Sequence, residues 1–433
     1  MSPPVKLTRP TEQVGGWIGE IPASWGFGLL KRFCSVTLGK MIPQVGDSDA
    51  PSGSPYLRAA HVQPLGRLWL EDIKLMQFSQ AEACRLTLAK GDVVVVEGGA
   101  GYGRAAFLKN DLEGWGFQNS INRVRTSASG DGRYVNYLFS GIQGAGVFET
   151  LINTSTIPHL TAEKLEVVAV PWPPLDEQRQ IAEYLDRETG KIDELIAKQE
   201  QLVATLTERI TALWTNRLDL LKAQHPTVSI RRVISSIVDG PFGSSLTSAH
   251  YSDEGARVIR LGNIGIFTFK DVDEAYVPLD YARELSAHAV LAGDVVVAGL
   301  GDDKMMPLGR AAVVPQTLGI ALVKADCYRV RPNERVSAEY LAWALSSPQL
   351  REQFKILSRG STRQRLNTAV VREATIPLPP RVEQDDAVEQ FTRESAQTGQ
   401  VVLKAKQVVE TLRERRAALI SAAVTGKIDV RGL

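Results

Sequence analysis

Cysteine is scarce in this sequence, and the few cysteines are not spaced for chemistry. The 433 residues include three of them, Cys34, Cys84 and Cys327, far apart and without a metal-binding spacing. They provide no disulfide framework, and so low a count is typical of a protein in a reducing cytoplasm. The five histidines are also dispersed, so the sequence predicts no metal site.

Long hydrophobic runs are missing as well. No apolar stretch approaches the roughly 20 residues that a membrane-spanning helix needs, and the opening Met1–Pro4 segment leads into no apolar signal core. Basic and acidic residues nearly balance, at 50 and 49, for a net charge of +1. That balance neither supports nor excludes a nucleic-acid partner, because a DNA reader needs only a local basic face. With 44% hydrophobic residues, we predict a soluble, cytoplasmic, multidomain protein.

The sequence also lacks recognisable catalytic motifs. Glu97–Gly103 is rich in glycine, but its spacing does not fit G-x-G-x-x-G and no helix signal follows it directly. No G-x-x-x-x-G-K-[ST] loop is present for a nucleotide. Pro171–Pro174 and Pro377–Pro380 lack the leading Asn or Asp and the following aromatic residue of an amino-methyltransferase motif. We therefore predict no catalytic residues, and we interpret the proline runs as rigid hinges.

The sequence contains an internal duplication. Val170–Gln178 resembles Ile376–Gln384, which lies 206 residues later, and Arg104–Ala106 matches Arg310–Ala312 at the same offset. A repeat of this length indicates duplicated domains rather than a solenoid of short units.

Both copies have the same internal order. Asp92–Glu97 and Asp294–Ala298 are valine-rich runs bounded by glycines, which predicts buried strands. Glycine-rich loops follow at Gly98–Gly103 and Gly299–Gly309, and each copy then reaches its proline run. Because proline cannot continue a helix or a central strand, each domain is expected to end there.

A long helix is predicted after each proline run. From Asp176 to about Lys222, and again in the second copy, apolar residues recur every seven positions, which favours a coiled coil. We expect the two helices to pair antiparallel, although two unrelated helices packed on their own domains remain an alternative. Ile181, Tyr184 and Trp214 lie off the repeat and either dock a partner or pack on the domains. The expected helix–helix packing residues are Leu185, Ile192, Ile196, Val203, Leu206, Ile210, Leu213, Phe391, Val402, Val409, Leu412 and Leu419.

Four stretches, taken in order, resemble the specificity subunit of type I restriction–modification systems. Gly16–Trp25 resembles the family's entry into its first domain, the two Pro-Pro…Glu-Gln motifs resemble its domain exits, and Ala417–Val430 resembles its C-terminal tail. The fold class expected from the resemblance and the repeat is α+β: two pseudo-symmetric α/β target-recognition domains separated by two long antiparallel coiled-coil helices. The expected boundaries are 1–175 and 225–381 for the domains, and 176–224 and 382–433 for the helices with the tail.

The resemblance also implies function and partners. Each recognition domain would read half of a split, asymmetric site on double-stranded DNA, with the two halves roughly 10 base pairs apart. The helices would dock two modification methyltransferase subunits, and restriction–translocase subunits would complete the complex. The chain itself would be non-catalytic and hold no cofactor, since S-adenosylmethionine, ATP and Mg²⁺ would belong to the partners. Two alternatives remain open: a specificity subunit whose partner fuses nuclease and methylase, and a non-catalytic coiled-coil scaffold that binds proteins.

Candidate DNA contacts are polar residues of the two recognition regions. Arginine suits phosphates and guanine edges, and Asn or Gln suits adenine. The resemblance does not place these contacts, because recognition regions vary with the DNA target, and solvated loops or ties between domain and helix are the open alternative. The candidates are Arg58, Arg104, Gln118, Asn119 and Arg123 in the first region, and Arg260, Arg310, Arg359, Arg363, Gln364 and Arg365 in the second.

Overall fold

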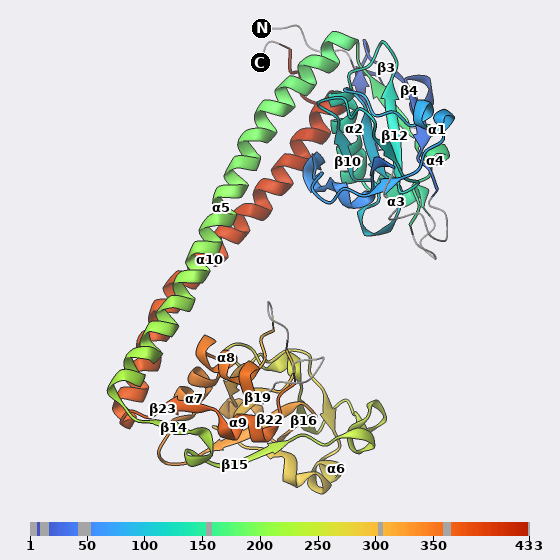
Figure 1. Ribbon diagram of the computed structural model, residues 1–433. Coiled ribbons are helices and arrows are strands. Elements are labelled where there is room, and N and C mark those ends of the chain that lie inside the picture. The colour runs from blue at the N-terminus through green and yellow to red at the C-terminus, as the bar shows by residue number, and fades with distance from the viewer. Residues whose placement is uncertain are drawn as a thin grey trace. The chain divides into compact units, whose positions relative to one another are not determined.

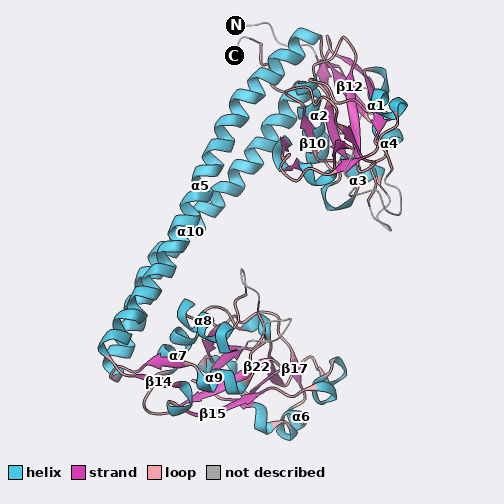
Figure 2. Cartoon of the chain, viewed as in Figure 1, coloured by secondary structure: helices cyan, strands magenta, loops and turns pink. Residues whose placement is uncertain are grey.

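The computed structural model describes residues 7–8, 17–41, 53–152, 158–301, 306–357 and 365–431. The chain divides into unit 1, residues 1–200 and 407–433, and unit 2, residues 201–406. Each unit contains one α/β domain and segments of two long helices, α5 (Leu175–Gln224) and α10 (Arg381–Val424), as Figures 1 and 2 show. Both helices begin one residue before the expected starts.

In unit 1, a four-stranded antiparallel sheet has helices on one face and a smaller sheet on the other. Val93 and Val95 of its central strand pack into the core beneath α2, whereas Val94 and Val96 pack into a second core. Because successive strand residues point to opposite faces, four consecutive buried valines indicate a sheet covered on both sides. In sheet order, the strands are β10 (Ala105–Phe107), β9 (Val93–Val96), β12 (Ile121–Thr126) and β4 (Cys34–Leu38).

The remaining elements of unit 1 surround this sheet. The smaller sheet has the order β11 (Gly116–Phe117), β5 (Ser54–Leu57) and β8 (Leu75–Met76). Three two-stranded pairs join β1 (Leu7–Thr8) to β2 (Ile21–Pro22), β3 (Gly26–Leu29) to β13 (Ala169–Trp172), and β6 (Val62–Gln63) to β7 (Arg67–Leu68). The short helices are α1 (Gln80–Arg85), α2 (Gly132–Gly144), α3 (Val147–Leu151) and α4 (Ala162–Glu166).

Unit 2 repeats this plan. Val295 and Val297 pack into the core that holds α7, and Val296 and Ala298 pack into the core on the opposite face. The main sheet has the order β20 (Ala311–Val313), β19 (Val295–Ala298), β22 (Cys327–Pro332), β15 (Ile234–Asp239), and the second has β17 (Tyr276–Val277), β16 (Ala256–Ile259), β21 (Ala321–Val323), β18 (Ala289–Val290). The other elements are β14 (Thr227–Ser229) paired with β23 (Thr375–Pro377), and α6 (Leu279–Glu284), α7 (Ala338–Leu345), α8 (Pro348–Leu357) and α9 (Thr368–Glu373).

The long helices pair antiparallel within each unit. In unit 1, Asp193 of α5 pairs with Arg416 of α10 at 2.9 Å, and Glu200 pairs with Arg413 at 2.9 Å. The partner number falls as the α5 number rises, which is the signature of antiparallel helices. In unit 2, Trp214 packs on Phe391 and His225 pairs with Glu383, in the same direction. The antiparallel pairing expected from the duplicated sequence is confirmed.

The predicted packing residues fall into two groups. Ile192, Ile196 and Val409 are buried together between the helices, with Leu412 and Leu419 partly buried around them. Leu185 and Phe391 instead lie in the domain cores. The remaining residues of the predicted repeat are half-buried: Val203, Leu206, Ile210, Leu213 and Val402.

The three apolar residues off the heptad repeat pack on the domains. Ile181 is buried in the core of unit 1, and Tyr184 lies partly buried against that core. Trp214 stacks on Trp343 of α7 with ring centroids 6.1 Å apart, inside the core of unit 2. Of the two roles left open by the sequence, the structure therefore shows packing on the domains.

The two end motifs of the chain meet in unit 1. Ile18 and Trp25 share a core with Ile420 and Val424 at the end of α10. Gly426 follows that helix with a φ of 72°, a left-handed conformation typical of a helix stop. A Cβ at Gly426 would lie 2.4 Å from Pro22, so only glycine fits this position.

A buried glutamine fixes each proline hinge. The Gln178 amide donates to the carbonyls of Pro173 at 2.8 Å and Ser129 at 3.1 Å, and its oxygen accepts the N–H of Asp131 at 2.9 Å. Gln384 makes the three equivalent bonds in unit 2, at 2.9, 2.9 and 2.8 Å. These bonds tie the start of each long helix to the loop before α2 or α7, which explains why the motif ends in glutamine in both copies.

Replacing Gln178 with leucine tests this tie. Gln178→Leu leaves two buried carbonyls and one N–H without a partner, so we expect the free energy of unfolding of unit 1 to fall by about 2–4 kcal/mol. The measurement is urea denaturation followed by tryptophan fluorescence. The control is Gln180→Leu, two residues further along α5 and exposed. Equal midpoints for both variants would contradict the role given to Gln178.

Candidate nucleic-acid interface

A buried carboxylate braces the main sheet of each domain. Asp92 accepts from the Arg125 guanidinium at 2.6 Å, and Asp294 accepts from Arg331 at 2.7 Å. The hydrogen bond with the aspartate raises the pKa of each arginine. These identical braces show that the two domains present their loops on the same scaffold.

Two candidate DNA contacts are buried. Arg310 is 2% exposed, and its guanidinium donates to the carbonyls of Ile264 at 2.7 Å and Leu300 at 2.9 Å, among others. Arg123 is 6% exposed and donates to the carbonyl of Thr87 at 2.6 Å. Side chains bound in this way cross-link loops of the domain, so the structure does not support the prediction that Arg123 and Arg310 contact DNA.

Arg58 and Arg260 occupy equivalent places at the surface. Arg58 follows β5 in the smaller sheet of unit 1, Arg260 follows β16 in the second sheet of unit 2, and each precedes a 3₁₀ turn. Arg58 pairs with the exposed Asp72 at 2.7 Å, and Arg260 pairs with the exposed Asp273 at 2.5 Å. A carboxylate reduces the attraction of either arginine for phosphate, although both guanidinium groups remain partly accessible.

The other predicted contacts lie on loops at the end of the main sheet or beside it. Gln118 and Asn119 are half-buried in the loop before β12, where the main-chain N–H of Asn119 donates to the Lys40 carbonyl at 2.8 Å. Arg104 is half-buried in the loop after Gly103. Arg365 is exposed and reaches the loop before β22 in unit 2. The remaining candidates, Arg359, Arg363 and Gln364, lie outside the described residues.

Around Arg365 the structure gathers residues that the sequence analysis did not single out. Arg365 pairs with Asp326 at 2.6 Å and lies over the ring of Phe242, with its guanidinium carbon 5.4 Å from the ring centroid. Asp239 accepts the main-chain N–H of Asp326 at 3.0 Å. Burial raises the pKa of Asp239. The sequence offered one signal for this cluster. A glycine follows the first strand of the main sheet in each copy, and in unit 2 it is Gly240.

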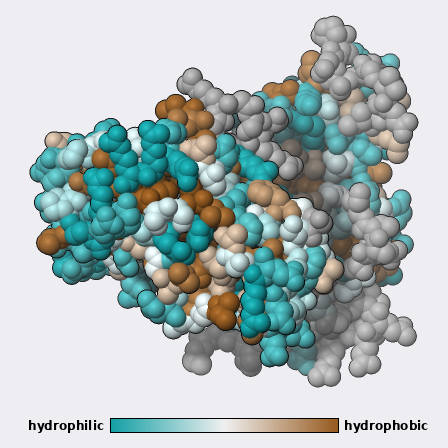
Figure 3. All heavy atoms as spheres, turned by 90° about the horizontal axis from the view of Figure 1, so that it is seen from below, coloured by the Kyte–Doolittle hydropathy of each residue, from teal (hydrophilic) through white to brown (hydrophobic). Residues whose placement is uncertain are grey.

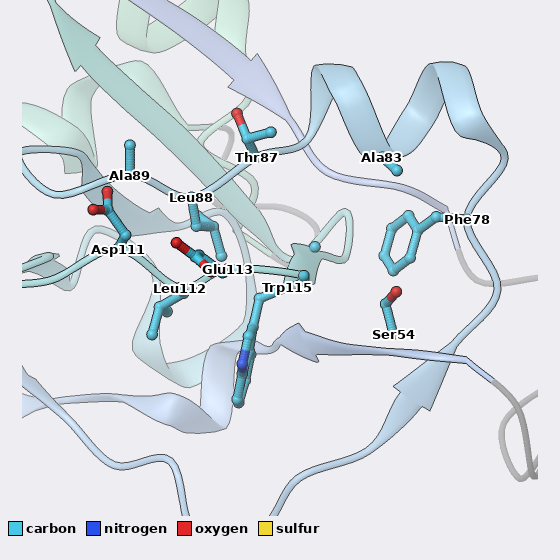
Figure 4. Close-up of a pocket in the computed structure, with 12 residues that line it drawn as sticks. Ser54, Phe78, Ala83, Thr87, Leu88, Ala89, Asp111, Leu112, Glu113 and Trp115 are labelled. Atoms are coloured by element: carbon cyan, nitrogen blue, oxygen red, sulfur yellow. The ribbon is translucent and has the colours of Figure 1, made fainter.

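Unit 1 also contains a pocket of about 380 Å³ beside α1. Figure 4 shows the side chains of Asp111, Glu113 and Trp115 among those that line it. The Asp111 carboxylate already accepts the main-chain N–H of Lys90 at 2.8 Å. The lining residues include no histidine, cysteine or lysine.

Among the described residues, no cluster of three or more His, Cys, Asp and Glu side chains is placed to bind a metal ion. None of the helices found there is both long enough and apolar enough to cross a membrane. On the face drawn in Figure 3, hydrophobic and hydrophilic residues are interspersed.

Comparison with known proteins gives one family. Residues 22–204 match the family described as the type I restriction modification DNA specificity domain. The type I restriction enzyme MjaVIII specificity subunit of Methanocaldococcus jannaschii is 18% identical, with 95% of each chain covered. The EcoBI specificity subunit of Escherichia coli is 23% identical, with 64% of this chain and 63% of that protein covered. These matches confirm the resemblance stated from the sequence motifs.

A solved structure shares the fold. A chain from a study of complex assembly and conformational transition in a type I restriction–modification system superposes with a TM-score of 0.65. It covers 94% of this chain and 99% of its own length, at 16% sequence identity. The expected α+β class, with two domains and paired long helices, is confirmed.

The three thiols differ in reactivity because two of them are buried. Burial raises the pKa of the Cys34 thiol to about 12, and that of Cys327 also to about 12, whereas Cys84 is exposed. Because the thiolate is the reactive form, we expect iodoacetamide at pH 8 to modify Cys84 in the native protein and to spare the other two. Mass spectrometry of peptides checks this, with protein alkylated in urea as the control. Native alkylation of Cys34 or Cys327 would contradict the burial.

The structural role of Arg310 is tested against its counterpart Arg104. Arg310→Ala leaves several buried carbonyls without a donor, so we expect the free energy of unfolding of unit 2 to fall by about 3 kcal/mol. Arg104 is at the matching position of unit 1 but is half-buried, and Arg104→Ala should cost less than about 1 kcal/mol. Urea denaturation measures both. If Arg310→Ala unfolds like the wild type and instead weakens DNA binding, the original prediction is restored.

Proposed function

We propose that this chain is the DNA-specificity subunit of a type I restriction–modification enzyme and directs that enzyme to one split DNA sequence. The observation that carries the proposal is the pair of α/β domains in a single chain, built on the same scaffold but with different loop residues. Gly39 and Gly240 occupy equivalent positions, whereas the exposed residues that follow them, Met41 and Phe242, differ. Two unlike readers imply two unlike half-sites. A palindromic site would require two identical readers.

The second part of the proposal concerns partners. Both long helices leave apolar side chains exposed after pairing and after packing on the domains: Leu195 and Leu202 on α5, and Val401, Leu403 and Val408 on α10. Apolar groups exposed along a helix are suited to bind another protein. We assign these faces to two modification methyltransferase subunits, with restriction–translocase subunits joining the complex.

The third part concerns chemistry. The chain directs catalysis by its partners and performs none itself, and S-adenosylmethionine, ATP and Mg²⁺ are bound by those partners. The absence of a phosphate loop and of an amino-methyltransferase motif from the sequence supports this division. DNA affinity of the complex should fall steeply with salt, because phosphate contacts release counterions.

Methylome sequencing of the host tests the proposed function. We compare cells with and without this gene, with the neighbouring genes intact, and restore the gene from a plasmid as the control. The expected result is a methylated motif that is split and asymmetric, disappears with the gene and returns with the plasmid. An unchanged methylome would remove the support for a specificity subunit. Proteins that copurify with the tagged chain then distinguish separate modification subunits from a fused nuclease–methylase.

A further inference from the structure

The end of the main sheet is built alike in the two domains. Gly39 follows β4 and Gly240 follows β15, and each packs against the backbone of the loop that leads into the neighbouring strand. A Cβ would lie 2.2 Å from the carbonyl oxygen of Gln118 in the first case and 2.1 Å from the carbonyl carbon of Lys324 in the second. Any side chain at either glycine would push these loops apart, so the backbone at this end is held in one place.

A second loop joins this end in both domains through an equivalent bridge. Gly98 pairs with His159 in unit 1, and Leu300 pairs with Arg365 in unit 2. His159 and Arg365 are separated by the 206 residues of the repeat and follow the same path. We call the residues at this position, Met41 and His159 in unit 1 and Phe242 and Arg365 in unit 2, the tip of each domain.

The tips combine a fixed backbone with variable side chains. Met41 is 73% exposed and Phe242 is 51% exposed, although each stands only two residues after a tightly packed glycine. Surface phenylalanine and methionine contribute little to folding, whereas they can contact a thymine methyl group or a base face. The scaffold residues are the same in both copies and the tip residues differ, which is the pattern required of two readers with different targets.

In unit 2, the tip arginine is preorganised. Asp326 holds the Arg365 guanidinium at 2.6 Å, and Phe242 lies beneath it at 5.4 Å. Asp326 itself has a φ of 66° and is anchored through its N–H to Asp239. A carboxylate partner lowers the attraction of an arginine for phosphates in general, but the ion pair with Asp326 and the ring of Phe242 together restrict where the Arg365 guanidinium lies. A guanidinium restricted in position is suited to bidentate recognition of guanine O6 and N7.

We propose that Arg365 and Phe242 form a base-reading pair, in which Arg365 recognises the guanine of one G·C pair and Phe242 packs against the neighbouring base. This proposal rests on the proposed function and assigns its specificity in one half-site to named side chains. In unit 1, Met41 and His159 stand at the matching positions of the chain. The substrate of the pair is the major-groove edge of duplex DNA.

The test uses the whole complex in the host. Arg365→Lys keeps the positive charge but loses the bidentate fork, and Phe242→Ala removes the ring. We expect Arg365→Lys to relax the methylated motif at one G·C position while the other half-site is unchanged. For the purified complex, affinity for the wild-type site should fall about 5- to 100-fold, and affinity for unrelated duplex should change little. Phe242→Ala should weaken the same half-site.

Matched controls separate reading from folding. Arg283→Lys alters an arginine that is more exposed, and Ile320→Ala removes an exposed apolar side chain of the same unit away from the tip. Both should leave the motif and the affinity unchanged. All variants are compared by thermal unfolding, since a purely structural Arg365 would lower the midpoint without changing the motif.

The outcomes distinguish this inference from the proposed function. If the wild-type complex shows no sequence preference, the proposed function fails and the inference fails with it. If the wild-type complex reads a split motif and Arg365→Lys reads the same one with equal affinity, only the tip assignment is overturned. If Arg365→Ala lowers the affinity for cognate and for unrelated DNA equally, Arg365 contacts a phosphate, and the tip assignment is also overturned.

Discussion

The packing of helix ends into the domain cores is the interaction on which the rest of this structure depends. In unit 2, Trp214, Leu218 and Leu221 of α5 are buried in the same core as the residues of α7. In unit 1, Ile420 and Val424 of α10 are buried in the equivalent core. Neither α/β domain has a complete core without these helix ends, which directly precede the first strand of unit 2 but come from the far end of the chain in unit 1. The long helices are therefore structural parts of both domains as well as connections between them.

This dependence explains why the sequence predicted the architecture better than it predicted where individual residues are buried. Heptad spacing identified both helices, because a long apolar period has few other structural solutions, and the duplication predicted that they pair antiparallel. It also placed Leu185 and Phe391 in the helix–helix seam, although both lie in domain cores. Sequence period shows that a helix has an apolar face, but only the fold determines whether that face meets another helix or a sheet.

The candidate interface was less predictable for a physical reason. Arginine is chemically suited to phosphates, to base edges and to clusters of main-chain carbonyls, and sequence does not distinguish these environments. Arg310 proved to be a buried cross-link, while Arg365 from the same copy is exposed beside Asp326. Met41 and Phe242 escaped notice because an apolar residue after a glycine is normally read as core. Only the structure shows that both side chains are exposed, although the nearby Gly39 and Gly240 pack tightly against Gln118 and Lys324.

The separation of scaffold from tip has an energetic consequence. A substitution at Gly39 or Gly240 collides with backbone, and one at Gly426 collides with the ring of Pro22. A substitution at Gln178 or Gln384 leaves buried polar groups without partners. Each of these is a cause of large destabilisation. A substitution at Met41 or Phe242 changes a side chain that is mostly in solvent, where changes usually cost within about 0.5 kcal/mol. The tip can therefore carry different side chains at little cost to folding. Because the two copies share the scaffold, each tip can differ independently, and one chain can hold two unlike readers.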